Sequence, residues 1–333
     1  MQVNRRKIVV LGTGGTIAGV AARPSDNLGY VAAQQGVDEL LGGLPGLAEF
    51  PLEVRSEQVA QIDSKNMDFA DWQRLLRRCQ HWLACDDVQA VVVTHGTDTL
   101  EETAYFLQAV LAPRKPVVLT CAMRPASSIG ADGPQNLMDA LTVAAYPGAQ
   151  GVVAVCAGTI HGALDVQKVH TWRLDAFSSG DAGAIGQVAQ GALYLWRDWP
   201  PSSPAFTKDE VERIASLARW PRVEIVTSHA GASGALVDAL VSAKVAQVMG
   251  NVPAQGIVVA ATGNGSLHHE LEAALLRAQE GGVRVVRATR CCQGQVASAT
   301  EHAIPDSKGL SAVKARVAMI LQLIAQSQGA ALG

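Results

Sequence analysis

The chain has 333 residues, of which 48% are hydrophobic and 17% are charged, so it can bury a sizeable core and is not expected to be disordered. Its formal net charge of −3 lacks the basic excess of proteins that bind nucleic acid or an anionic membrane surface, so neither is expected as a partner. No apolar run reaches the roughly 18 residues that cross a bilayer. The apolar stretch near the start is too short for a signal peptide, which favours a cytoplasmic protein.

Short β-branched runs alternate with amphipathic segments in the first half of the chain. Strands are predicted over residues 7–11, 52–55, 88–94, 116–121 and 151–156. Helices are predicted over 69–83, where apolar side chains recur at helical spacing, and over 99–111 and 135–145. Strands that alternate with helices in this way form a mainly parallel sheet covered on both faces.

The pattern breaks near residue 200, where three prolines in "WRDWPPSSPAF" exclude a regular element. Beyond it, strands are predicted over 223–227, 256–261 and 283–288, and helices over 234–243, 267–279 and 310–326. We therefore expect an α/β fold with two domains. A larger, flavodoxin-like domain would span 1–195, a linker 196–221, and a smaller α/β domain 222–333.

Glycine and small polar residues follow several of the predicted strands. The first strand leads into "GTGGTIAG", which is not a dinucleotide fingerprint because Ile17 stands where the third glycine belongs. From this loop alone, turn glycines with a purely structural role remain an equal alternative. In such sheets ligands bind beyond the carboxyl ends of the strands, so these loops are where a site is expected.

The third predicted strand leads into "THGTDTLEETAYFL", where Thr97 and Asp98 lie between a buried strand and a helix N-terminus. Free backbone amides at such a point can hold an anion or a developing oxyanion. The alternative for Thr97, Asp98 or Thr99 is helix capping. His95, in the same loop, is interpreted as a buried structural histidine rather than as a general base.

Taken together, "GTGGTIAG" and "THGTDTLEETAYFL" resemble the bacterial-type L-asparaginase family, whose members are threonine amidohydrolases related to the glutaminase-asparaginases. Later segments match the family in order, so the resemblance covers nearly the whole chain. It implies hydrolysis of L-asparagine to L-aspartate and ammonia through a threonine acyl-enzyme. It implies neither a metal nor another cofactor.

The resemblance also implies a set of catalytic residues. Thr16 is similar to the primary nucleophile, and Tyr30 to the tyrosine of a covering loop that helps to activate it. Thr97 and Asp98 resemble a second threonine and its neighbouring aspartate, and Lys168 in "LDVQKVHTW" resembles the lysine beside them. Lys168 would act either as a desolvated base or as a cation that orients Thr97.

Further residues are implied to bind the substrate. Thr97 and Ala122 would offer backbone amides to the oxyanion, while Asp98 suits the substrate ammonium and Ser64 its carboxylate. Lys65 departs from the family, in which Gln or Glu often follows that serine.

Two residues near the end of the chain complete the implied set. Ser266 lies where members carry Asn or Ser, and Glu301 matches a glutamate that the neighbouring subunit contributes. The resemblance thus implies a homotetramer built from intimate dimers. Two alternatives remain open, namely comparable activity on glutamine and a non-catalytic protein that binds an amino acid.

Overall fold

The structure, a computed structural model, describes residues 6–297 and 302–327. The chain divides into two compact units, Met1–Thr207 and Lys208–Gly333. The division falls inside the segment 196–221 that the sequence predicts as a linker, and this segment contains one helix, α5 (Lys208–Ser216). No helix of the described residues is long and apolar enough to cross a membrane.

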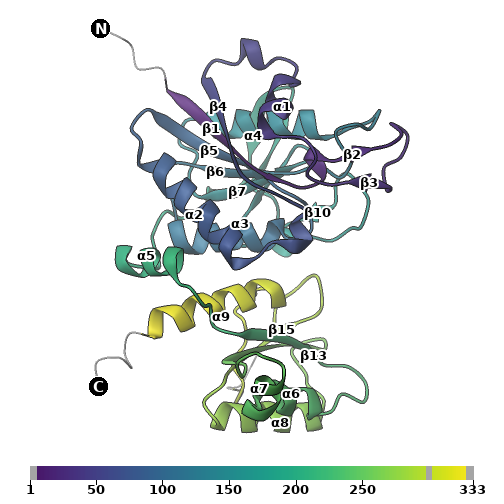
Figure 1. Cartoon of the computed structure of the whole chain (residues 1–333), viewed down its shortest axis with the longest axis vertical. Helices are drawn as coiled ribbons and strands as arrows, with labels where there is room; N and C mark the ends of the chain where they lie inside the picture. Colours follow the sequence, from purple (N-terminus) through teal and green to yellow (C-terminus); the bar gives the residue numbers. More distant parts are fainter. Residues whose placement is uncertain (1–5, 298–301, 328–333) are drawn as a thin grey trace. The chain divides into compact units, whose positions relative to one another are not determined.

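An eight-stranded sheet forms the centre of the first unit (Figure 1). Its strands, in the order in which they lie side by side, are β12 (Ala192–Leu195), β11 (Gly186–Ala189), β8 (Thr159–Gly162), β7 (Val152–Cys156), β6 (Val117–Thr120), β5 (Val88–Thr94), β1 (Lys7–Gly14) and β4 (Glu53–Ile62). The run from β4 to β7 is parallel, whereas β8, β11 and β12 pair antiparallel. The predicted mainly parallel α/β fold is confirmed, although the antiparallel extension was not predicted.

The parallel strands are buried because helices cover both faces of the sheet. One face carries α4 (Gly133–Ala145) and α1 (Val37–Gly42), and the other carries α2 (Phe69–Ala84) and α3 (Leu100–Leu111), as Figure 1 shows. Helix α2 begins where Asp68 accepts a hydrogen bond from the Asp71 amide and Asp71 accepts one from the Asp68 amide. This reciprocal capping fixes the start of the helix.

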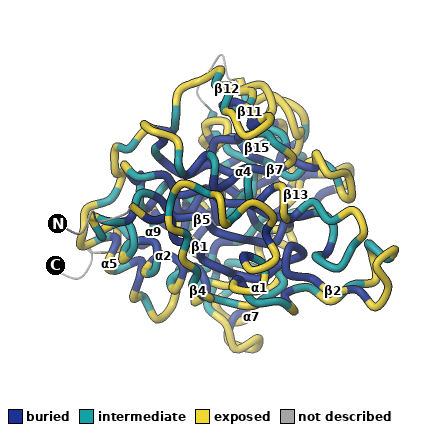
Figure 2. The backbone as a smooth tube through the Cα atoms, turned by 90° about the horizontal axis from the view of Figure 1, so that it is seen from above, coloured by how far each residue is buried: buried dark blue, intermediate teal, exposed yellow. Residues whose placement is uncertain are grey.

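Small elements surround the ends of these strands. They are η1 (Thr16–Ala18), the hairpin of β2 (Val20–Ala21) and β3 (Tyr30–Val31), η2 (Leu47–Glu49), η3 (Ser64–Asn66), the pair β9 (Gln167–Lys168) and β10 (Phe177–Ser178), and η4 (Gly180–Ala182). Figure 2 shows the contrast between the buried strands β1 and β5 and the exposed segments near β2.

The second unit is a smaller α/β layer. Its parallel strands lie in the order β13 (Val223–Thr227), β14 (Gly256–Ala261) and β15 (Arg284–Thr289). Helix α9 (Ala312–Gln326) covers one face, and α6 (Ala235–Val241), α7 (Ala243–Val248) and α8 (His269–Glu280) lie on the other (Figure 1). The helix predicted over 234–243 corresponds to α6, which ends at Val241. Helix α7, which Ser242 caps through its hydroxyl, was not predicted.

The strand order fixes where the first unit can hold a ligand. If the five parallel strands are numbered by their order along the chain, their order across the sheet is 2-1-3-4-5. The first connection leads from β1 to its neighbour β4 on one side, and the next leads from β4 to β5 on the other side of β1. Ligands bind at such a switch point, outside the carboxyl ends of the strands. The switch point lies between β1 and β5, the strands that lead to Thr16 and Thr97.

Candidate active site

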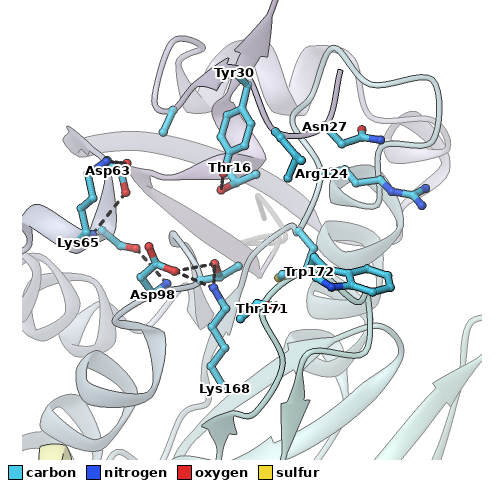
Figure 3. Close-up of a pocket in the computed structure, with 15 residues that line it drawn as sticks. Thr16, Asn27, Tyr30, Asp63, Lys65, Asp98, Arg124, Lys168, Thr171 and Trp172 are labelled. Carbon is cyan, nitrogen blue, oxygen red and sulfur yellow. Dashed lines mark hydrogen bonds and ion pairs between the residues drawn. The ribbon is translucent and has the colours of Figure 1, made fainter. Parts of the chain in front are cut away.

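A pocket of about 710 Å³ opens at this switch point. Seven of the ten site residues predicted from the sequence line it, namely Thr16, Tyr30, Ser64, Lys65, Thr97, Asp98 and Lys168. They come from the loops after β1, β4 and β5, from β3 and from β9. Figure 3 shows Thr16, Lys65, Asp98 and Lys168 among the side chains around this pocket. The fold thus brings together residues that are separated by up to about half of the chain.

Thr16 is the first residue of η1, directly after β1. Its Oγ1 lies 2.7 Å from the phenolic oxygen of Tyr30, and either oxygen can be the donor. Gly19 allows this contact, because a Cβ there would lie 2.8 Å from the Tyr30 ring. The neighbouring hydroxyl, that of Thr13, instead donates to the Thr94 carbonyl at 2.8 Å and ties β1 to β5. Of these two threonines, therefore, only Thr16 lines the pocket.

Thr97, Asp98 and Lys168 form the second polar group of the pocket (Figure 3). The Lys168 ammonium donates to Thr97 Oγ1 at 2.8 Å and to Asp98 Oδ1 at 2.6 Å. The Lys168 side chain is 18% exposed and that of Asp98 49% exposed, so the pair lies partly within the pocket and partly in contact with solvent. An ammonium in this position orients the Thr97 oxygen and balances the charge of Asp98.

Helix capping by a side chain does not account for the polar residues of the loop before α3. Thr99 occupies the cap position of α3, but its hydroxyl donates to the Ser64 carbonyl at 2.9 Å instead of capping the helix. The Asp98 amide donates to Ser64 Oγ at 3.2 Å. The polar groups of this loop thus bind η3 and Lys168, which joins two strand ends into one site.

Two glycines let these loops approach each other. Gly15 has φ +85°, and a Cβ there would lie 2.4 Å from the Gly96 backbone. A Cβ on Gly96 would lie 2.4 Å from Ser64 Oγ. Any larger residue at either position must displace the backbone or side chain that carries Thr16, Thr97 or Ser64.

Lys65 lies at the rim of the pocket with its side chain 65% exposed. Its ammonium pairs with Asp63 at 2.8 Å, and this hydrogen bond raises the pKa of Lys65. The Coulomb attraction of Asp98 contributes in the same direction. A cation therefore stands at the pocket mouth.

Ala122 does not line the pocket, although the following residue, Met123, does. Ala122 packs with Ile17 and Ala18 in a small buried cluster. The Asp132 carboxylate accepts hydrogen bonds from the amide of Met123 and from that of Arg124, both at 2.9 Å. The backbone beside Ala122 is thus held in a fixed direction.

The outer wall of the pocket contains residues that sequence reasoning missed. They are Asn27, Leu28, Ala32, Asp63, Met123, Arg124, Thr171 and Trp172. All eight lie within four residues of a predicted site residue, so proximity in sequence was the one available signal. No motif distinguished them from ordinary loop residues.

The last two predicted residues are Ser266 and Glu301. Ser266 belongs to the second unit, where its backbone forms an isolated bridge with Thr262 after β14. Glu301 lies outside the described residues. Among the described residues, no group of three or more His, Cys, Asp or Glu side chains is placed to hold a metal ion.

A flavodoxin-like sheet whose switch point holds two threonines, a lysine and a carboxylate carries the groups that hydrolysis of an amide requires. The comparison with protein families agrees with an amidohydrolase. Residues 7–200 match the family described as "Asparaginase, N-terminal", and residues 222–332 match the "Glutaminase/Asparaginase C-terminal domain". The chain belongs to the asparaginase family.

The chain is similar both to relatives named asparaginase and to relatives named glutaminase-asparaginase. It is 37% identical over 321 residues to "L-asparaginase 2" of Bacillus subtilis (strain 168), covering 95% of this chain and 82% of the relative. It is 35% identical over 289 residues to "Glutaminase-asparaginase" of Pseudomonas fluorescens biotype A, covering 86% and 76%. The crystal structure of the "Probable Cytoplasmic L-asparaginase" from Campylobacter jejuni is similar with a TM-score of 0.86 and 34% identity, covering 97% of this chain and 96% of that one.

Proposed function

We propose that the chain is an L-asparaginase that hydrolyses L-asparagine to L-aspartate and ammonia, with Thr16 as the nucleophile. One observation carries this proposal. Two hydroxyls from distant loops share a pocket, and each is hydrogen-bonded to a group that can move or hold a proton. An amide carbonyl requires such a hydroxyl nucleophile, a proton acceptor and donors aimed at its oxygen.

In the first step, Thr16 Oγ1 attacks the side-chain carbonyl carbon of asparagine, and its proton leaves along the hydrogen bond to Tyr30. The amide nitrogen takes up a proton, the C–N bond breaks and ammonia departs, which leaves an aspartyl ester on Thr16. In the second step water attacks this ester, and aspartate is released while Thr16 regains its proton. Lys168, as a cation paired with Asp98, holds Thr97 in place for both steps.

The charged groups at the pocket assign the two ends of the substrate. Asp98 attracts the α-ammonium group, and Ser64 binds the α-carboxylate. The backbone amide of Thr97 stabilises the oxyanion that develops on the side-chain carbonyl. The Lys65 cation favours the carboxylate over the ammonium, so this departure from the family adjusts the balance between the two ends.

Comparable activity on glutamine is a second candidate because one of the relatives is named a glutaminase-asparaginase. One methylene group in a pocket changes binding by only about 1–3 kcal/mol. The pocket, about 710 Å³ in volume, is not a close fit for a single small amino acid. The ratio of kcat/KM for the two amides decides this point.

The resemblance to the asparaginase family is also the basis for a proposal on the assembly and cellular location of the protein. We propose a cytoplasmic homotetramer of intimate dimers, in which the smaller domain supplies Ser266 and Glu301 to the site of the neighbouring subunit. Analytical ultracentrifugation combined with activity across a dilution series tests this assembly. Activity that persists in a fully monomeric sample would contradict it.

The function is tested by ammonia release from asparagine and glutamine at micromolar to millimolar concentrations. Thr16→Ala and Thr97→Ala should each reduce release by several orders of magnitude and leave the melting temperature nearly unchanged. Thr142→Ala is the matched control, because this threonine bonds only within helix α4, to the Met138 carbonyl. Stable binding of asparagine by the unmodified protein without ammonia release would contradict the proposal and favour a non-catalytic binding protein.

A further inference from the structure

A chain of three hydrogen bonds lies in the core beneath the Thr97 loop. Trp72 Nε1 donates to Thr103 Oγ1 at 2.9 Å, and Thr103 Oγ1 lies 3.0 Å from His95 Nε2. His95 Nδ1 lies 2.7 Å from the carbonyl oxygen of Gly96. His95 itself is 0% exposed, so it cannot touch a molecule in the pocket.

The chemistry of the partners fixes the direction of every bond in this chain. A carbonyl oxygen only accepts, so the proton on His95 must be on Nδ1. Burial lowers the pKa of His95 to about 4, so the ring is neutral at physiological pH and Nε2 carries a lone pair. Nε2 therefore accepts from the Thr103 hydroxyl, which in turn accepts from the donor-only indole of Trp72.

The last bond of the chain orients one peptide group. The Gly96 carbonyl and the Thr97 N–H belong to the same planar trans peptide, so they point in opposite directions. Since the carbonyl points to the buried His95 ring, the Thr97 N–H points away from it. Thr97 lines the pocket, so its N–H is directed to the pocket side.

The Thr97 amide is also unoccupied. Within the described part of the chain no acceptor lies within hydrogen-bonding range of this N–H, although Thr97 is only 6% exposed. Buried backbone N–H groups without a partner are rare in folded proteins. The next amide along, that of Asp98, already donates to Ser64. The Thr97 N–H is therefore available to a ligand.

We propose that His95 is a positioning residue for the hydrolysis: through Gly96 it fixes the peptide that aims the Thr97 N–H at the oxyanion. Thr103 and Trp72 keep the imidazole proton on Nδ1. This inference rests on the proposed function, because the oxyanion arises only if an amide carbonyl is attacked. It adds a role for three buried residues that do not touch the substrate.

The test compares variants that differ in one hydrogen bond. His95→Leu removes the donor to Gly96, whereas His95→Asn keeps an N–H near the Nδ1 position. Thr103→Val leaves the ring in place but removes its hydroxyl partner. His161→Leu is the matched control, since His161 is also buried in the first unit but bonds to Ser179. For each variant kcat and KM for ammonia release from asparagine and the melting temperature are measured.

We expect His95→Leu to reduce kcat by about 10- to 100-fold with KM changed by less than about 3-fold, because a misaimed oxyanion donor acts on the transition state. His95→Asn should recover most of that loss, and Thr103→Val should reduce kcat by roughly 3- to 10-fold. His161→Leu should alter the melting temperature without altering kcat.

Equal kcat in His95→Leu and His95→Asn, or losses in all variants that only follow the melting temperature, would overturn the inference. Should His95→Leu fail to fold, an unchanged kcat in Thr103→Val would overturn it. If the unmodified protein releases no ammonia, the proposed function itself fails, and this outcome is distinct from the others.

Discussion

Replacement of Lys168 by methionine separates catalysis from folding at this site. Methionine has a similar length and no charge, so the change removes both hydrogen bonds of the ammonium, the one to Thr97 and the one to Asp98. The shape of the pocket wall is retained. The substitution therefore tests the amine alone.

The expected magnitudes come from the two contacts and their exposure. Loss of one preorganised donor at a reacting centre typically costs about 10²–10³ in kcat, and we expect Lys168→Met to lose at least that much. Asp98 is 49% exposed, so water solvates the carboxylate once the ammonium is gone. The free energy of unfolding should therefore change by only about 1 kcal/mol or less.

Ammonia release and urea unfolding measure these two quantities on the same samples. Lys115→Met is the control, because Lys115 is half-buried in the same unit but bonds to the Cys85 carbonyl. Lys168→Arg keeps a permanent cation and should retain more activity than Lys168→Met, as expected if Lys168 orients Thr97 rather than removing its proton. A Lys168→Met enzyme within about threefold of the original kcat/KM would refute the reasoning.

Three further predictions concern Tyr30, Lys65 and His95. Tyr30→Phe removes the oxygen that lies 2.7 Å from Thr16 Oγ1, so kcat should fall by about 10²-fold while KM changes little. Steady-state ammonia release measures both constants. An unchanged kcat would contradict the role of Tyr30 in accepting the Thr16 proton. Lys65→Gln removes a cation that repels the substrate ammonium. It should therefore raise kcat/KM for asparagine relative to kcat/KM for succinamate, which has no ammonium group. A constant ratio of the two kcat/KM values would show that Lys65 plays no part in selectivity. Burial lowers the pKa of His95 from 6.5 to about 4, so the unfolded chain takes up a proton first as the pH falls from 6.5 to 4. The free energy of unfolding should then decrease by about 3 kcal/mol over this range at 1.36 kcal/mol per pKa unit, and urea unfolding should show that His95→Asn lacks this contribution.

The central strands were predictable because their chemistry is local. Strand β5 has the predicted bounds, Val88–Thr94, since its sequence is mostly β-branched and the run 91–94 is buried on both faces. Strands β1 and β4 extend further than predicted, into the loops that carry Thr16 and Ser64. Pairing of β1 with β4 continues through these extensions, a contact that no single segment of sequence reveals.

The antiparallel strands β8, β11 and β12 were missed because their turns lack the usual signal. Two-residue hairpin turns with positive φ at both positions favour Asn-Gly or Asp-Gly. Here Ala157 and Gly158 turn β7 into β8, and Gln190 and Gly191 turn β11 into β12, all with positive φ. Alanine and glutamine rarely adopt that conformation, so the sequence did not indicate a turn.

At the site, too, residues within short sequence motifs were predictable, whereas contacts between loops that are distant in the sequence were not. The residues of the two threonine motifs could be proposed from sequence because the two motifs together are specific. The ion pair of Lys65 with Asp63, the hydrogen bonds of Asp132 to the backbone beside Ala122, and the buried bonds of His95 depend on the packing of several loops. These contacts became visible only in the folded chain.

The most direct test of the account is to identify the residue that carries the acyl group. The enzyme is mixed with asparagine, quenched in acid within milliseconds to seconds, and digested for peptide mass spectrometry. The account predicts that the peptide containing Thr16 gains the mass of one aspartyl group, and that Thr16→Ala abolishes this product. An aspartyl group on Thr97 instead, or turnover by Thr16→Ala at the normal rate, would contradict it.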